Sequence, residues 1–250
     1  MRLALILPVS FAALVVGCGG AAPKPAPYVE TGALRGRIEQ GTYHDKRGWF
    51  QVGTPFHEDE PQFPYLKIRE EYPENVSFVN FTLLSNPGEN YVAYVEDLIA
   101  GHHTEGDLDQ MLDAAVRFFG KQVTDIRLEP MQLVKEEAWQ TGSSHGIIRF
   151  YTETASSTQA MAPYGMLDMG EDYTAYIVLY ITVKAGKVAV LWTEWPHDCK
   201  VCAATPKVDG AVATDDPIAA VLAGNARAAS FIASLRYTDT GETTGASRSQ

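Results

Sequence analysis

The clearest periodic pattern in the chain lies between residues 173 and 195. From Tyr173 to Val183 every second residue is apolar, while the residues between them are of mixed character. A period of two is typical of a β-strand that has one face firmly covered by other parts of the protein. Gly186 can adopt the positive φ of a tight turn, and the β-rich segment 188–195 follows it. The pattern predicts an antiparallel hairpin made of strands 173–183 and 188–195.

Other segments rich in β-branched and aromatic residues predict further short strands. Each is bounded by proline, glycine or polar turn residues. They are 33–38, 48–52, 76–84, 91–95, 123–128, 132–138 and 146–152, with one extended piece at 65–69 inside a proline-rich loop over 54–75. A polar turn around residues 44–48 is expected to join the first two. These elements predict an antiparallel sheet.

Two segments have the period of a helix instead. Apolar residues recur three and four positions apart from Leu108 to Phe119, and Gly120 is placed to end that helix. A second amphipathic pattern starts at Asp216, has Pro217 in its first turn and continues to Leu235. We therefore expect an α+β fold, in which one antiparallel β-sheet is flanked by two main helices, as a single domain over residues 33–237.

The first residues have the form of a secretion signal. An apolar run too short to span a membrane ends in Val15-Val16-Gly17-Cys18. This resembles the signal of bacterial lipoproteins, and the resemblance implies that residues 1–17 are removed and that Cys18 carries a lipid. The cysteine is followed by Gly19 and not by aspartate, which resembles lipoproteins that are not retained at the inner membrane. The alternative is an ordinary cleaved signal with an incidental cysteine.

The two ends of the mature chain have no apolar period. Residues 18–32 are small and rich in proline and alanine, so we expect a semi-extended tether that follows the lipid anchor. Residues 238–250 are polar and are expected to form a disordered tail. Both segments therefore lie outside the predicted domain.

The order of the elements carries a resemblance of its own. An opening strand Gly48–Val52 is closed by Pro55, and a middle helix, several long antiparallel strands and a last helix ending at Phe231–Arg236 follow. This order resembles that of the PsbP-like α/β/α sandwich superfamily over residues 33–237. The resemblance implies a binding or accessory protein with no enzymatic activity, a group that includes envelope lipoproteins. It transfers no functional residue, because no functional motif is matched.

Charge excludes one class of partner. The chain has 31 acidic and 20 basic residues and a formal net charge of -11. Such a balance discourages binding to nucleic acid and to anionic lipid surfaces. The expected contacts are the membrane, through the lipid on Cys18, and an envelope protein partner or a small ligand.

Cys199 and Cys202 are the only thiols left once Cys18 is lipidated. An oxidising envelope favours a disulfide between them. A thioredoxin-like role requires the first cysteine at a helix N-terminus, but Pro206 and the acidic residues that follow it separate the pair from the last helix. The sequence therefore favours a structural disulfide over redox catalysis.

A soft-metal site is the alternative hypothesis. If the three strands from 146 to 195 pair in order, the loops 153–172 and 196–215 leave the same end of the sheet. Their thioether, thiolate and imidazole groups suit copper(I), or zinc with less need for methionine. The candidate ligands are His197, Cys199, Cys202, Met161, Met166 and Met169. The methionines could instead form an apolar flap over the sheet, in which case no cofactor is expected.

The remaining candidates are weaker. Residues 142–146 match the G-x-S-x-G pattern around Ser144, but a strand follows where a nucleophile elbow requires a helix. The clusters at 57–60 and 101–105 contain histidine and acidic residues in polar loops, without the spacing of a known ligand set. No catalytic residue is predicted, and we do not expect an enzyme.

Three aromatic residues of the central hairpin are a further candidate. Tyr176, Tyr180 and Trp192 could together line a ligand-binding face. Alternatively, one of the two predicted helices could cover them.

Overall fold

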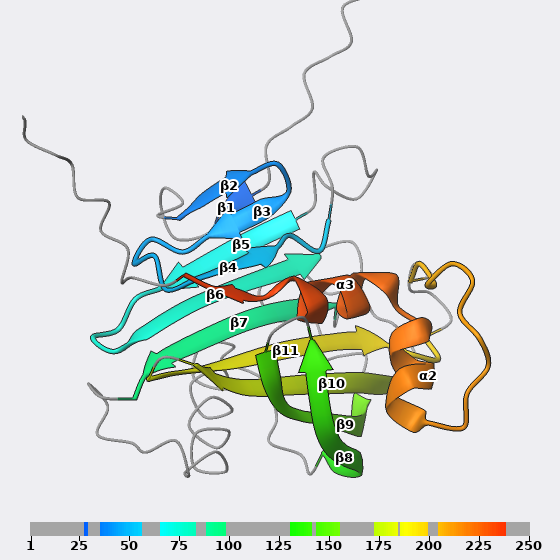
Figure 1. The fold of residues 1–250 in the computed structure, drawn as a ribbon. Coiled ribbons are helices and arrows are strands. Elements are labelled where there is room, and N and C mark those ends of the chain that lie inside the picture. The colour runs from blue at the N-terminus through cyan, green and yellow to red at the C-terminus, as the bar shows by residue number, and fades with distance from the viewer. Residues whose placement is uncertain are drawn as a thin grey trace, which may run out of the picture.

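The computed structural model describes residues 28–29, 36–56, 66–83, 89–98, 131–141, 144–155, 173–184, 186–199 and 205–238. These residues form two β-sheets and two short helices, as Figure 1 shows. The fold is mostly antiparallel β and belongs broadly to the α+β class.

The larger sheet contains seven antiparallel strands and the two-residue strand β1, which pairs in parallel with β5. In spatial order the strands are β1 (Tyr28–Val29), β5 (Leu66–Glu71), β6 (Val76–Leu83), β7 (Asn90–Asp97), β11 (Lys187–Pro196), β10 (Tyr173–Lys184), β9 (Ser144–Ala155) and β8 (Gln132–Thr141). The predicted hairpin is confirmed as β10–β11, and Gly186 in its turn has a φ of 71°. The strands predicted from 76 to 95 and from 132 to 152 are also confirmed.

A second sheet was not predicted. It contains β12 (Arg236–Tyr237), β4 (Phe50–Gly53), β3 (Thr42–His44) and β2 (Arg37–Glu39), in that order. The turn expected around 44–48 joins β3 to β4, and β2 reaches β3 through Gln40 and Gly41, which have φ values of 49° and 73°. Two positive φ values in succession suit a tight hairpin turn, so β2 and β3 form a hairpin of their own. The expectation of a single sheet was therefore wrong.

The last helix is divided in two. Helix α2 (Pro217–Ala223) and helix α3 (Ala226–Ser234) are separated at Gly224 and Asn225. Asn225 is extended, its side chain accepts a hydrogen bond from Ala228 N, and its amide donates to the Tyr91 hydroxyl at 3.4 Å. Because Asn225 caps a new helix and contacts β7, the predicted continuous helix over 216–235 was wrong. The helix predicted over 107–120 and the strand predicted over 123–128 lie outside the described residues.

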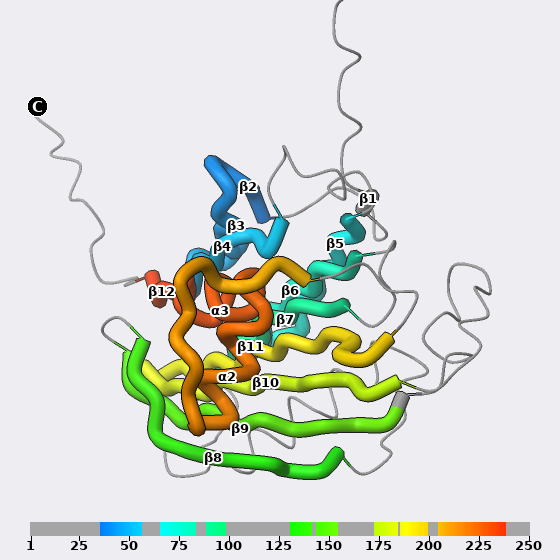
Figure 2. The backbone as a smooth tube through the Cα atoms, turned by 90° about the vertical axis from the view of Figure 1, so that its right-hand side faces the viewer, coloured from blue at the N-terminus to red at the C-terminus, as the bar shows by residue number. Residues whose placement is uncertain are grey.

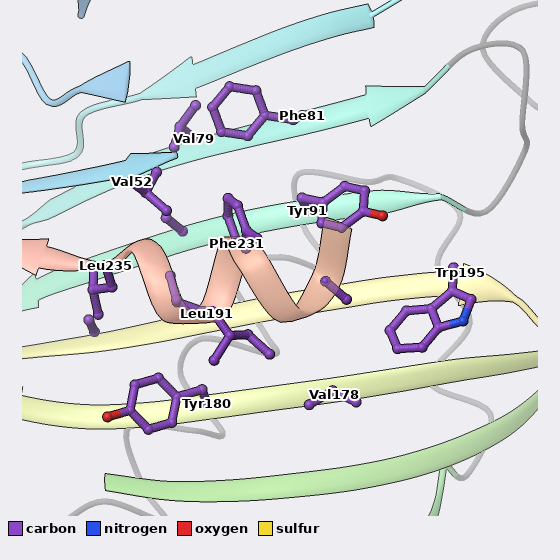
Figure 3. Packing of buried hydrophobic residues seen from close by; sticks show 14 of the residues in the cluster. Val52, Val79, Phe81, Tyr91, Val178, Tyr180, Leu191, Trp195, Phe231 and Leu235 are labelled. Carbon is purple, nitrogen blue, oxygen red and sulfur yellow. The ribbon is translucent and has the colours of Figure 1, made fainter. Parts of the chain in front are cut away.

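Both helices and the smaller sheet pack on one face of the large sheet, here termed the first face. Phe231 of α3 lies over the sheet, with ring centroids 5.6 Å from Tyr91 and 6.2 Å from Phe81 (Figure 3). Figure 2 gives a second view of α2, α3 and the smaller sheet beside the large sheet. The same apolar cluster includes Val52 of β4 and Leu191 of β11. The packing therefore joins both sheets and both helices in one core.

The opposite face, termed the second face, is also buried. Phe78, Val92, Ile177, Leu179 and Trp192 belong to a separate apolar cluster there, and each is at most 4 % exposed. The apolar face predicted for β10 is therefore confirmed as buried, and Tyr180 and Val178 on the first face are buried as well. Sheets buried on both faces have nearly continuous apolar strands, as β6, β7 and β11 do here.

Buried polar groups fasten α3 to β7. Glu89 is 0 % exposed, and its Oε1 accepts hydrogen bonds from Tyr91 Oη at 2.8 Å and Arg227 Nη1 at 3.2 Å. The Arg227 guanidinium also lies 4.6 Å from the centre of the Phe56 ring. A buried carboxylate needs such partners, because an unpaired charge in the interior is strongly destabilising.

A second buried network fastens the smaller sheet to β5. Glu70 Oε1 accepts hydrogen bonds from Tyr43 Oη at 2.5 Å, Tyr72 Oη at 2.8 Å and Gly36 N at 2.9 Å. Burial raises the pKa of both tyrosines, and the Glu70 carboxylate adds to the effect. Both phenols therefore remain hydrogen-bond donors at neutral pH.

Gly146 of β9 has no room for a side chain. A Cβ atom there would lie 2.0 Å from the Ile181 carbonyl oxygen and 2.9 Å from the Tyr180 ring. We expect Gly146→Ala to lower the free energy of unfolding by about 1–3 kcal/mol or more, measured by urea denaturation. Gly224→Ala is the control, since Gly224 has a helical φ of -74° and its nearest contact would be 3.2 Å. Equal losses in the two variants would contradict the prediction.

Candidate functional site

Three strands meet at one end of the large sheet, the end toward which the arrow of β11 points in Figure 1. Tyr173 of β10 pairs with Ala155 of β9, and Ala175 of β10 pairs with Pro196 of β11. The end of β9, the start of β10 and the end of β11 therefore adjoin, as the predicted strand pairing requires. This region is termed the loop end of the sheet.

Four aromatic side chains gather on the first face at the loop end. The rings of Tyr176 and His197 are stacked, with centroids 3.9 Å apart and an interplanar angle of 15°. Phe150 and Trp195 contact Tyr176 edge-on, at 5.1 Å and 6.2 Å. Phe150 and Trp195 are buried, Tyr176 is half-buried and His197 is exposed. These four residues are termed the aromatic surface. Phe150, Trp195 and Tyr176 pack together, and His197 lies on Tyr176 with its ring exposed.

Thr174 holds the segment that carries His197. Its backbone N–H donates to Asp198 Oδ1 at 2.5 Å, its hydroxyl donates to Asp198 Oδ2 at 3.1 Å, and its carbonyl accepts from His197 N at 2.8 Å. The hydrogen bond from the Thr174 N–H is the main reason why the pKa of Asp198 is lowered. Asp198 is therefore ionised at neutral pH, and the segment is fixed beside β10.

Tyr176 is a neutral phenol in this setting. Burial raises its pKa, and the negative charge of Asp198 raises it further. Aromatic rings with a polar atom at one edge favour contacts that are apolar on one side and hydrogen-bonded on the other. The surface thus offers contact area and polar groups, which are the features of a binding site.

Cys199 follows this surface and is disulfide-bonded. Cys18 and Cys202 lie outside the described residues, so the pairing of Cys199 with Cys202 stays a prediction. A thiolate is the form of cysteine that binds metals, and a disulfide sulfur is not one. In this state Cys199 does not supply the soft ligand that the metal hypothesis requires.

Most of the other predicted metal ligands cannot be placed. Met161, Met166 and Met169 lie outside the described residues, as do the histidine clusters at 57–60 and 101–105. Within the part of the chain that the structure describes, no three histidine, cysteine or acidic side chains form a group that could hold a metal.

The three aromatic residues predicted to share a face do not do so. Trp192 of β11 lies opposite Leu179 of β10 and belongs to the cluster on the second face. Tyr176 and Tyr180 contribute to the first face, where Trp195 is the aromatic residue directly opposite Tyr176. The prediction was therefore wrong for Trp192. This residue and Trp195 are three positions apart on one strand, so their side chains point to opposite faces.

Ser144 occupies a hairpin. It is the first residue of β9 and pairs with Thr141 of β8, and the strand continues from it without a helix. Its carbonyl accepts a hydrogen bond from Tyr180 Oη. The strand–turn–helix setting of a nucleophile elbow is thus absent at this serine.

Sequence reasoning missed two acidic residues at the loop end. Glu153 of β9 and Glu194 of β11 both lie on the second face, beside Tyr173. Burial raises the pKa of Glu194 to about 8, and the nearby charge of Glu153 contributes. The signal was present in the alternation of β11, where Val188, Val190 and Trp192 place position 194 on the same face.

No protein-family model matches this chain, and no curated protein is significantly similar to it. Among the described residues, neither of the helices has the length and apolar character needed to cross a membrane.

Removing the Asp198 carboxylate tests how the aromatic surface is held. We expect Asp198→Ala to speed amide hydrogen exchange at Thr174 at neutral pH, because the acceptor of its N–H is lost. Global stability should change little, since Asp198 is exposed. The same loosening is expected in the unmodified protein in acid, because a lowered pKa means that the interaction is lost as pH falls through it. Asp209→Ala, an exposed control, should leave Thr174 unchanged, and unchanged exchange in Asp198→Ala would refute the assignment.

Proposed function

We propose that this protein is a lipid-anchored lipoprotein of the bacterial cell envelope, at the outer membrane, with a non-catalytic binding or accessory role. The observation that carries the binding role is the exposed ring of His197, stacked on Tyr176 and fixed by Asp198 at the loop end. The partner is an envelope protein or a small ligand with a flat apolar face.

The anchor is proposed at Cys18. The apolar run and the Val16-Gly17-Cys18 sequence support lipidation. The ten residues from Gly19 to Tyr28 can span about 30 Å when extended. Tyr28 of β1 pairs with Lys67 of β5, close to the residue of β5 nearest the loop end. The tether would therefore enter the folded domain at the end of the sheet that carries the aromatic surface. A partner bound to that surface would then lie near the membrane.

The finer fold proposed is a PsbP-like α/β/α sandwich. Helices α2 and α3 would form one helical layer, and the helix predicted over 107–120 would form the other. Support comes from the apolar and buried second face, which a second helical layer would suit. The smaller four-stranded sheet is an addition to that architecture.

A soft-metal or thiol-handling role is the second candidate. It is supported by the position of Cys199 two residues from His197, and it requires reduction of the Cys199 disulfide, because only the thiolate binds a metal. Copper or zinc would then be the expected metal.

The anchor and the disulfide are tested together by intact-mass analysis of protein purified from its native envelope. We expect lipid mass on Cys18, and alkylation of two cysteines only after reduction. The Cys18→Ser variant should lose the lipid mass and leave the membrane fraction. Alkylation without reduction would favour the second candidate, and an unlipidated wild-type protein would refute the anchor.

The binding role is tested by photo-crosslinking in intact envelopes. A photoreactive phenylalanine analogue at position 197 keeps an aromatic ring on Tyr176 and should form one discrete adduct. The analogue at Val212, which is 84 % exposed, is the control and should not form it. Tyr176→Ala, which removes the stacking partner, should weaken the adduct at position 197 several-fold. The same adducts at both positions, or none at 197, would count against this surface.

A further inference from the structure

Basic and aromatic side chains alternate at the end of the large sheet opposite the loop end. This end carries the turn between β10 and β11, is the end toward which the arrow of β7 points in Figure 1, and is termed the turn end. Lys187 Nζ lies 5.4 Å from the centre of the Trp49 ring, and the Arg47 guanidinium lies 4.7 Å from the same ring. Arg47 also lies 5.8 Å from the centre of the Tyr72 ring, and Lys46 Nζ lies 6.0 Å from it. These five residues, three cations separated by two rings, are termed the basic row.

The middle of the basic row is fixed by hydrogen bonds. Arg47 lies in the turn between β3 and β4 and reaches the segment that follows β5. Its guanidinium donates to the carbonyl oxygens of three successive residues, Tyr72 at 3.0 Å, Pro73 at 2.5 Å and Glu74 at 2.9 Å. Because these acceptors are neutral, the bonds hold the guanidinium in place and leave its positive charge uncompensated.

The cations of the basic row differ from most other basic residues of the described chain. Salt bridges to carboxylates are formed elsewhere by Arg37, Arg69, Lys135, Arg149 and Arg227. Within the described ranges, no salt bridge is formed by the three cations of the row or by Lys184, which pairs with Lys187 across the turn and is exposed. The turn end therefore gathers positive charge that the chain does not neutralise by contact.

The acidic residues of the same region compensate this charge only in part. The segments that meet at the turn end, 44–49, 72–75, 97–98 and 184–187, contain four basic residues and the acidic residues Asp45, Glu74 and Asp97. Asp45 is 7 % exposed, and its Oδ2 atom accepts from Arg47 N and Trp49 N, both at 3.1 Å. Two accessible acidic residues thus face four cations. The turn end is locally positive, although the chain has a formal net charge of -11.

We propose that the basic row is a docking surface for an extended acidic segment of a partner protein. An extended chain places side chains on the same side about every 7 Å, a scale similar to that of cations separated by one aromatic ring. Carboxylates of such a segment would form charge-assisted hydrogen bonds with Lys46 and Lys187. The half-buried rings of Trp49 and Tyr72 would contact the apolar stems of the acidic side chains.

Charge favours a peptide segment over an anionic membrane as the occupant. A bilayer would face the whole end of an acidic domain, including Glu74 and Asp97, and would be repelled by them. A single extended segment contacts the row alone, and the attraction is confined to contacts within a screening length of about 8 Å. The row lies at the opposite end of the hairpin from the aromatic surface. The inference therefore does not depend on the proposed function of that surface.

An NMR titration of the full mature chain, unlipidated through Cys18→Ser, with octaglutamate tests the proposal. At low salt we expect saturable shifts at the Trp49 indole N–H and at the amides of Lys46 and Lys187. The Trp195 indole at the loop end is the internal control and should not move. Affinity should fall several-fold in about 150 mM salt, because screening weakens contacts between exposed charges. Octalysine should produce none of these shifts, and an octaglutamate titration that leaves the row unshifted would overturn the proposal.

Charge reversal identifies the residues that bind. The double variant Lys46→Glu, Lys187→Glu should lower the affinity for octaglutamate about tenfold or more, because like charges then face the peptide. Lys184→Glu, at an exposed turn position that contacts neither ring of the row, should lower it several-fold without risk to the fold. Lys207→Glu is the matched control, since Lys207 is exposed in the segment before α2, and should leave the affinity unchanged.

A vesicle arm distinguishes the two kinds of anionic partner. We expect the unlipidated protein not to co-sediment with vesicles of phosphatidylglycerol and phosphatidylcholine at physiological salt. Co-sedimentation that Lys184→Glu abolishes, without octaglutamate binding, would replace the acidic segment by a lipid surface and overturn the proposal. Equal losses of octaglutamate affinity in Lys184→Glu and Lys207→Glu would also overturn it, because the binding would then follow net charge and not the row.

Discussion

The structure depends on the burial of the β10–β11 hairpin on both of its faces. Tyr180 and Leu191 lie under the helices on the first face, and Leu179 and Val190 are buried on the second. Burial of this kind stabilises the fold through the removal of apolar surface from water. It also means that any polar group on either face must find a partner or remain neutral. This requirement explains how the buried polar groups of the protein are arranged.

Some buried polar groups meet the condition through distant partners. Glu89 does so through Arg227 and Tyr91, and Glu70 does so through Tyr43 and Tyr72. Each pairing also joins two parts of the fold, since the first fixes α3 and the second fixes the smaller sheet. Glu194 differs from these residues because its Oε2 atom has no described partner. A raised pKa is the remaining way in which a carboxyl can be accommodated in such a place.

Local patterns predicted the elements that are regular over many residues. The period of two from Tyr173 to Val183 was enough to predict β10, and the turn at Gly186 followed from its position. The break between α2 and α3 could not be predicted in this way, because Asn225 contacts Tyr91, 134 residues earlier in the chain. The strands predicted over 33–38 and 48–52 overlap β2 and β4. Their separate sheet was not predicted, because β3 and β12, with three and two residues, are too short to show a period.

The candidate site shows the same division. Tyr176 and His197 were each recognised from the sequence, but their stacking depends on the register that places Trp195 opposite Tyr176. Trp192 was assigned to the wrong face because the register was not known. Glu194 could have been noticed from the alternation along β11. The absence of a described cation beside it could not, because that depends on the neighbouring strands.

The two ends of the central hairpin are secured differently, which explains why the chemistry gathers at one of them. At the turn end, Gly186 O accepts from Leu98 N at 2.9 Å, and Thr182 O accepts from Tyr237 Oη at 2.8 Å. These bonds are made by neutral groups and do not change between pH 4 and 9. At the loop end the corresponding contacts involve the carboxylate of Asp198 on one face and the acid of Glu194 on the other. Because the pKa of Asp198 is lowered and that of Glu194 is raised, acid weakens the first and alkali the second. The loop end therefore carries, on opposite faces of one hairpin, a carboxyl group that acid affects and a carboxyl group that alkali affects.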